Sequence, residues 1–377
     1  MNKQRQTLVT SCVMAGAVAL GMFGSAAVFA ADDTAPKGRT IAYAWTDNRW
    51  AVYETKDGKA ECPDGVVQLG PREQYKLQFP EDGTKRKLVD TELAREKDVF
   101  WPNAEPDRFP FHEATGKIAI GLDLDGKTKP TDFMTPEGKP GVDNNMYRVL
   151  GCVGNYRAAG SVLNFDRTFF KSRNINRVLI ELTDVDSLIN DDDVTVTMYR
   201  GRDQLLNDAT GNTFTPGGTQ RIDVRFGKIF QNHTKGKIVN GVLITQPMDI
   251  NMPHEAAYEE ASYDWIRDAR FEFKLTSERA EGVVGGYADI ESMYHSRNRS
   301  WGTHHEAYGQ QSQPSIYKEL LKWADAYPDP KTGKNTAISS AYESKLVQVR
   351  VLHPDKEVSE LRIAPSAKQF ADSNNAK

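Results

Sequence analysis

Apolar and polar residues alternate with a period of two over much of the middle of the chain. Phe271, Phe273 and Leu275 alternate with charged residues. This alternation is typical of an antiparallel strand that buries one face and exposes the other to solvent. The same pattern occurs in three further segments, at 178–183, 194–198 and 222–226. We therefore predict a mainly β core domain over residues 111–290.

Turn signals separate these predicted strands. Asn240-Gly241 and Pro216-Gly217-Gly218 are typical of tight turns, and Asp125-Gly126 closes a compact apolar run at 117–124. Strands do not alternate with helical segments, which argues against a parallel sheet with crossover helices. The expected fold is an antiparallel β-sandwich of the jelly-roll kind.

The best helix signal lies near the C-terminus, at 314–327. Ile316, Leu320 and Trp323 recur at helical spacing, and charged residues take the opposite face. Ser315 is expected as the N-cap, and a last strand is predicted at 341–352. This predicts a short C-terminal amphipathic helix beside the sheet.

Residues before the core domain are mixed in pattern. Short strand-like runs occur at 40–45 and 50–54, and a charged stretch at 90–97 is expected to form a short helix. The predicted organisation has five parts. These are a signal peptide at 1–30, an N-terminal extension at 31–110 packed on the main domain, the β-sandwich at 111–290, a C-terminal loop, helix and closing strand at 291–363, and a flexible tail at 364–377.

The first thirty residues have the pattern of a secretory signal peptide. Lys3 and Arg5 precede an uncharged apolar run at 8–23, and Ala30 supplies a small residue before a cleavage point. A membrane anchor is the alternative, but the apolar run is short for a spanning helix. We expect cleavage after Ala30, a periplasmic or secreted mature protein, and no integral membrane segment.

Composition narrows the class of protein further. The chain has 377 residues, with 48 Lys and Arg against 52 Asp and Glu and a net charge of -4. These values are ordinary for a globular protein and exclude a disordered or collagen-like chain. A nucleic-acid binder would normally carry a concentrated basic face, so no nucleic-acid partner is expected.

Cysteine usage fits export. Cys12 lies within the predicted signal peptide, so Cys62 and Cys152 remain in the mature chain. Two cysteines in an oxidising compartment usually pair, and closing a loop of this length contributes up to ~4 kcal/mol in the chain-entropy model. We predict a Cys62–Cys152 disulfide, with two separate thiols as the alternative.

The strongest chemical signal is a group of oxygen-bearing side chains that fall within 22 positions. The candidate metal ligands are Asp123, Asp125, Asp132, Asp143 and Asn144. Ca²⁺ takes about six to eight oxygen ligands, which a strand end with the sequence Asp-x-Asp-Gly can begin to supply. The third acid of an EF-hand and the acid at its twelfth position are absent. The prediction is a Ca²⁺ site; the alternative is a turn with solvated acids.

A second acidic run lies between two predicted strands. It contains five aspartates, at 184, 186, 191, 192 and 193. Carboxylates this close in sequence repel one another, and a cation would relieve the repulsion. A solvated connection that discourages edge-to-edge pairing is the alternative. The two acidic loops could also converge on one end of the fold.

A late segment mixes histidines, aromatic rings and cations. The candidate ligand-binding residues are His254, His295, Trp301, His304 and His305. Aromatic rings beside polar donors suit carbohydrate or another small ligand, and several histidines with an acid could bind a transition metal. The chain lacks a G-x-S-x-G elbow. Core packing against the C-terminal helix is the alternative.

The order of short motifs resembles a group of bacterial exported β-sandwich proteins without established activity. The motifs are Asp123-Leu-Asp-Gly126, Gly141-Val-Asp-Asn144, Arg177-Val-Leu-Ile180, Asn190-Asp-Asp-Asp-Val194, Gly241-Val-Leu243 and Gly282-Val-Val-Gly-Gly-Tyr287. The resemblance implies export and a sandwich fold, and it assigns no catalytic residue.

Taken together, the sequence predicts an exported Ca²⁺-binding β-sandwich protein with a binding or structural role and an unknown ligand. The alternative is a secreted or periplasmic hydrolase with a histidine and acid site at 254–308. Whether the protein is an enzyme stays open at this point.

Overall fold

The computed structural model describes residues 37–55, 92–95, 98–102, 113–153, 156–158, 160, 177–254, 262–297 and 313–354. The described residues all belong to one structural unit. The predicted signal peptide at 1–30 and the predicted tail at 364–377 lie outside the described residues, and both stay predictions.

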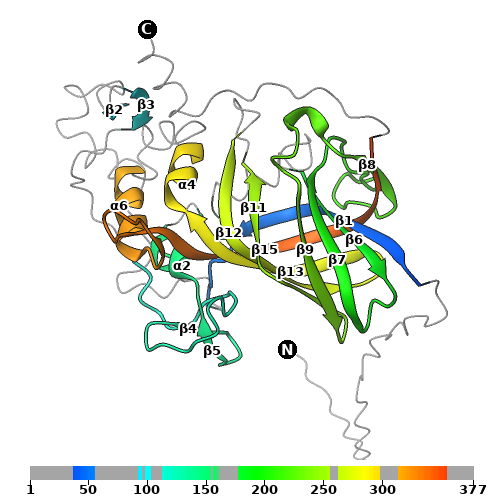
Figure 1. The fold of residues 1–377 in the computed structure, drawn as a ribbon, viewed down its shortest axis with the longest axis horizontal. Coiled ribbons are helices and arrows are strands. Elements are labelled where there is room, and N and C mark those ends of the chain that lie inside the picture. Colours follow the sequence, from blue (N-terminus) through cyan, green and yellow to red (C-terminus); the bar gives the residue numbers. More distant parts are fainter. Residues whose placement is uncertain are drawn as a thin grey trace, which may run out of the picture. The chain divides into compact units, whose positions relative to one another are not determined.

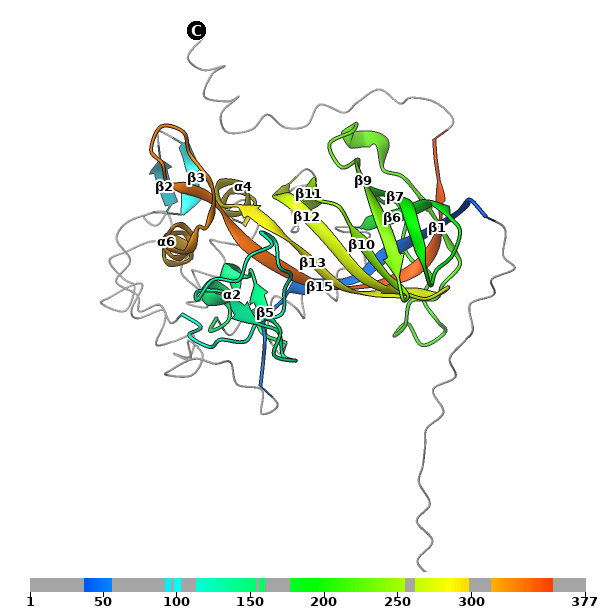
Figure 2. The same cartoon turned by 60° about the horizontal axis from the view of Figure 1, so that its bottom comes forward.

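The main sheet closes on itself as an eight-stranded antiparallel barrel (Figures 1 and 2). Its hydrogen-bonded order is β1-β6-β7-β9-β10-β12-β13-β15, and β15 pairs in turn with β1. The barrel strands are β1 (Arg39–Trp50), β6 (Val178–Val185), β7 (Asp191–Arg200), β9 (Asn232–Val239), β10 (Val242–Thr245), β12 (Tyr263–Leu275), β13 (Arg279–Asp289) and β15 (Asn335–Leu352).

The predicted sandwich is therefore wrong, and a mainly β fold is confirmed. Closure depends on β1, which pairs with β6 along one edge and with β15 along the other. Ala42, for example, lies opposite Glu181 on one side and Val349 on the other. Alternation along single strands is the same in a sandwich and a barrel, so the pattern alone does not reveal a pairing between the two ends of the chain.

Further strands extend the sheet or form small ribbons. β11 (Met248–Pro253) pairs with β12, β14 (Ala326–Pro328) pairs antiparallel with β15, and β8 (Gly218–Arg221) pairs parallel with β15. Two-stranded ribbons join β2 (Glu92–Arg95) to β3 (Asp98–Pro102) and β4 (Phe133–Met134) to β5 (Pro140–Val142). The described helices are α2 (Asn145–Leu150), α4 (Ile290–Arg297), α6 (Gln313–Trp323) and a 3₁₀ turn, η3 (Val224–Phe226).

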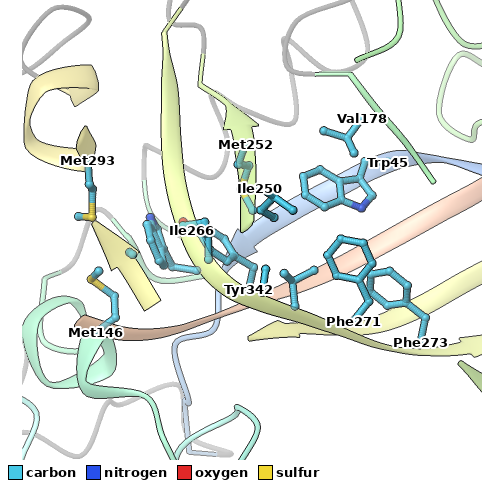
Figure 3. Packing of buried hydrophobic residues seen from close by; sticks show 14 of the residues in the cluster. Trp45, Met146, Val178, Ile250, Met252, Ile266, Phe271, Phe273, Met293 and Tyr342 are labelled. Atoms are coloured by element: carbon cyan, nitrogen blue, oxygen red, sulfur yellow. The ribbon is translucent and has the colours of Figure 1, made fainter. Parts of the chain in front are cut away.

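The barrel interior is filled by one set of alternate residues. Trp45 from β1 lies close to Phe271 from β12 and Ile250 from β11, and all three are at most 1% exposed (Figure 3). An eight-stranded barrel is just wide enough for its inward side chains to meet. Truncating a buried ring of this size to alanine costs about 3–5 kcal/mol.

A second, smaller cluster covers the outside of the barrel at the β1–β15 seam. Ala44, Leu179 and Val347 face outward there, and Leu205 and Phe214 from the segment after β7 pack on them. This outer layer places the loop between β7 and β9 against the closing strands. A polar pocket lies at the edge of this outer layer.

Several local predictions hold. The strands predicted at 178–183, 194–198 and 271–275 lie within β6, β7 and β12, and the last predicted strand lies within β15. Asn240 and Gly241 both have positive φ, of 52° and 80°, and connect β9 to β10 as a tight hairpin turn.

Other local predictions are wrong. Residues 222–226 are not a strand, because Asp223 accepts from the amide of Arg225 and starts η3. The charged stretch predicted to form a helix contains β2, and the apolar run at 117–124 makes isolated bridges only. Helix α6 ends at Trp323 rather than at 327, because the next residues form β14 beside β15.

Candidate metal site

The segment that carries the candidate ligands lies against β12 and β13. Leu122 packs on Gly285 so closely that a Cβ there would lie 3.0 Å from the leucine side chain. From β12, Arg270 donates through Nη1 to the carbonyl oxygens of Asp123, at 3.1 Å, and Leu124, at 2.6 Å. These contacts fix the backbone of the acidic turn on the outside of the barrel.

Three of the predicted ligands converge. One carboxylate oxygen from each of Asp123, Asp125 and Asp143 lies within 4.8 Å of the other two. Asp123 and Asp125 come from the turn after residue 122, whereas Asp143 follows β5 and its amide donates to the carbonyl of Leu122 at 2.9 Å. The return of the chain through Gly141, with φ of 91°, brings the third carboxylate to the first two.

Backbone amides orient all three carboxylates. Asp143 Oδ2 accepts from the amides of Leu124, at 2.8 Å, and Asp125, at 3.3 Å. Asp123 Oδ1 accepts from Gly126 at 2.7 Å, and Asp125 Oδ1 accepts from Lys127 at 2.9 Å. The turn therefore holds the carboxylates near one another by hydrogen bonds along its own backbone.

The electrostatics of the cluster single out Asp143. Burial raises the pKa of Asp143 to about 6, and the nearby charges of Asp125 and Asp132 add to the rise. The two amide hydrogen bonds act in the opposite direction. Ionising Asp143 is costly because the carboxylate is buried and lies beside other acids. A bound cation would stabilise its charged form.

Lys129 already offers a positive charge at the edge of the cluster. Its ammonium group contacts Asp125 Oδ2, and this bond holds the pKa of Asp125 below its ordinary value. The same contact raises the pKa of Lys129. A bound cation would compete with this ammonium group for the Asp125 carboxylate. The spacing of four residues between Asp125 and Lys129 is a signal in the sequence for this ion pair.

The other two predicted ligands have different roles. Asn144 is buried and is the N-cap of α2, where its Oδ1 accepts from the amide of Tyr147 at 3.2 Å. Its side-chain nitrogen donates to the carbonyls of Ala51, at 3.3 Å, and Ile120, at 2.7 Å. Asp132 is half-buried and accepts from the amide of Lys129. Neither belongs to the three-carboxylate group.

The second acidic run does not converge. Asp191 Oδ2 accepts from the amides of Asp186, at 2.6 Å, and Ser187, at 3.4 Å, while Asp193 pairs with Lys235. Within the described ranges, Asp123, Asp125 and Asp143 form the one group of three or more possible metal-ligating side chains of His, Cys, Asp or Glu. The second run therefore stabilises its own turn.

The predicted ligand-binding residues are only partly described. His254 and His295 are both half-buried, and the amide of His254 donates to the carbonyl of Ser262 at 2.9 Å. Trp301, His304 and His305 lie outside the described residues. Beside His295, Tyr294 is 1% exposed and stacks on Tyr317 with ring centroids 4.3 Å apart, so that tyrosine belongs to the core.

Of the two cysteines in the predicted disulfide, the structure describes one. Cys152 is fully buried in the main core cluster. Cys62 lies outside the described residues, and the pairing stays a prediction.

Comparison of the chain with protein-family models, with curated proteins and with solved structures finds no match. Among the helices that the structure describes, none has both the length and the apolar character needed to cross a membrane.

Proposed function

We propose that this protein binds Ca²⁺ through Asp123, Asp125 and Asp143, and that the ion has a structural role in an exported binding protein. The observation that supports the proposal is the approach of three carboxylate oxygens to within 4.8 Å, one of them from the buried Asp143. Calcium prefers hard oxygen ligands and accepts irregular sets of carboxylates, carbonyls and water.

The position of the cluster suggests what the ion would do. It would join the turn at 123–126 to the residue that precedes the N-cap of α2. Arg270 ties the same turn to β12, so the ion would strengthen the attachment of this segment to the barrel. Extracellular Ca²⁺ modules bind at about 10⁻⁴–10⁻³ M, and we expect a site of that strength here.

Thermal unfolding in EDTA and in about 10 mM Ca²⁺ tests the proposal. At ~100 times the Kd, a ligand adds about 2.7 kcal/mol to folded-state stability, which raises Tm by several degrees. The double variant Asp123→Ala with Asp125→Ala should lose this gain. The matched control, Asp191→Ala with Asp193→Ala, removes the same number of acids from the second acidic turn and should keep it.

Lys129 provides a sharper variant of the same experiment. In Lys129→Gln the competing ammonium group is gone and the acids stay, so the Ca²⁺ gain should be larger than in the wild type. An equal Tm in EDTA and in Ca²⁺ for both the wild type and this variant would show that the carboxylates are only a hydrogen-bonded turn.

A further inference from the structure

A polar pocket lies at the edge of the outer layer, far along the chain from the acidic turn. It has a volume of about 270 Å³ and opens between the end of β7, the loop around η3 and the end of β15. Its lining includes Tyr199, Arg200, Asp223, Gln231 and His353. No local motif marks these residues, because they come from three segments that are distant in the sequence.

Two carboxylates lie deep beside this pocket. The Glu181 side chain is 4% exposed, and its two oxygens lie 3.1 and 3.0 Å from Nε2 of His353. The Asp223 side chain is 1% exposed and makes two hydrogen bonds to Arg225, at 2.9 and 2.8 Å. Arg200 Nε lies 3.4 Å from the same aspartate.

Aromatic rings hold the cations in place. The guanidinium carbon of Arg200 lies 4.3 Å from the ring centroid of Phe226 and 5.2 Å from that of Phe230. Tyr199 packs edge-on against His353, with centroids 5.6 Å apart. Burial and the charge of Glu181 raise the pKa of Tyr199 to about 12, so its hydroxyl stays protonated beside Glu181, with which it shares a hydrogen bond.

The charges are layered from the interior to the rim. The acids form the inner layer, whereas the side chains of Arg225 and His353 are 35% and 54% exposed. Each acid orients a cation or an imidazole in the way that a carboxylate positions a ligating histidine. Of these charged and polar groups, the pocket itself is lined by Arg200, Gln231 and His353 beside the Asp223 carboxylate.

We propose that this pocket binds a small oxyanion, a carboxylate or a phosphate, through the lining residues Arg200 and His353, with Gln231 as a further donor. Arginine and histidine recognise such groups by charge-assisted hydrogen bonds. Ion pairs that only fastened the loop would not need to surround a cavity, and apolar residues would pack there at least as well. The proposal is independent of the calcium site.

Titration of the full mature protein with inorganic phosphate and, separately, with succinate tests this proposal. Binding is followed by calorimetry and by amide chemical shifts at constant ionic strength, with chloride as the inert anion. We expect saturable binding of at least one probe, and the stronger probe identifies the preferred anion. Arg200→Gln and His353→Gln should each weaken that binding at least tenfold.

Arg221→Gln is the matched control for these variants. The Arg221 side chain also donates to an aspartate, Asp203, but Arg221 does not line the pocket. Arg221→Gln should bind the preferred anion as tightly as the wild type does. If Arg200→Gln fails to fold, His353→Gln at the more exposed position decides the question. Absence of binding of both probes at tens of millimolar, or equal binding in the wild type and His353→Gln, would overturn the proposal.

Discussion

The two acidic turns of this protein differ in a way that their sequences do not suggest. The segment 184–193, which runs from the end of β6 into β7, holds five aspartates within ten positions, whereas the turn at 123–126 holds two. Yet the turn at 123–126, with fewer aspartates, belongs to the cluster of converging carboxylates, because the chain returns to it at Asp143, after β5. In the richer turn, Asp191 binds backbone amides of the same turn.

The comparison shows that the density of acids in a sequence is not a measure of convergence in space. Neighbouring carboxylates repel one another, and a tight turn lets them point apart into solvent. Convergence at Asp123 requires two things. A second segment, the one that carries Asp143, must return to the turn, and backbone amides must hold each carboxylate in place. We expect substitutions in the two turns to separate these effects.

The largest effect is expected for Asn144→Ala, which tests whether this residue is a cap rather than a ligand. The substitution removes an N-cap and leaves the carbonyls of Ala51 and Ile120 without their side-chain donor. Loss of the cap costs about 0.5–2 kcal/mol and each unpaired buried group costs about 1–3 kcal/mol more. We expect a loss of about 3–4 kcal/mol by chemical denaturation, near the low end of that sum. The loss should be equal in EDTA and in Ca²⁺; a loss of the calcium response would make Asn144 a ligand.

An intermediate effect is expected from the ionisation of Asp143. Its pKa in the folded protein is raised to about 6 from 3.8, so the folded state binds the proton more tightly than the unfolded chain. In EDTA this group therefore lowers stability as pH rises from about 4 to above 6. Asp143→Asn lacks this titration, so its Tm relative to the wild type should rise by a few degrees between pH 4.5 and 7.5.

Calcium should reverse that trend in the wild type. The ion competes with the proton on Asp143, so saturating Ca²⁺ should stabilise the wild type at pH 7.5 and leave Asp143→Asn unchanged. A Tm difference between the two proteins that does not vary with pH in EDTA would contradict the account of Asp143.

The smallest effect is expected in the second turn. Asp191→Ala removes a side chain that accepts from two amides of its own turn, and such a loss costs about 1 kcal/mol. Unfolding by urea at pH 7.5 should show this loss equally with and without Ca²⁺. A larger loss in Ca²⁺ than in EDTA would mean that this turn also binds the ion.

The sequence predicts the local elements well where a single pattern determines them. Alternation at Phe271 and Phe273 marks β12, Asn240-Gly241 marks a hairpin, and Ile316 with Leu320 marks the buried face of α6. Each of these signals lies within a few residues and reflects one physical preference, of a strand face, a positive φ or a helical stripe.

The sequence does not predict features that depend on distant partners. The pairing of Ala42 with Val349 closes the barrel, and β8 joins β15 in parallel, but neither pairing has a local signal. Helix α4 was missed because its buried side includes a polar residue, Ser296, whose hydroxyl bonds Asp264 at 2.6 Å.

The candidate metal site can be predicted from the sequence only in part. The motif at Asp123 and Asp125 is local, and Asp143 was expected to return to it. Asn144 was also expected as a ligand, because an amide oxygen in sequence looks the same whether it binds an ion or caps a helix. Only the position of α2, directly after Asn144, separates the two roles.

The most direct test of the central claim is a calorimetric titration of the EDTA-treated, dialysed mature protein with Ca²⁺ at pH 7.5. The account predicts one ion per chain in the wild type and in Asp191→Ala with Asp193→Ala, and no binding in Asp143→Asn. Undiminished binding in Asp143→Asn, or no heat of binding in the wild type up to about 10 mM Ca²⁺, ten times the weak end of the extracellular range, would contradict it.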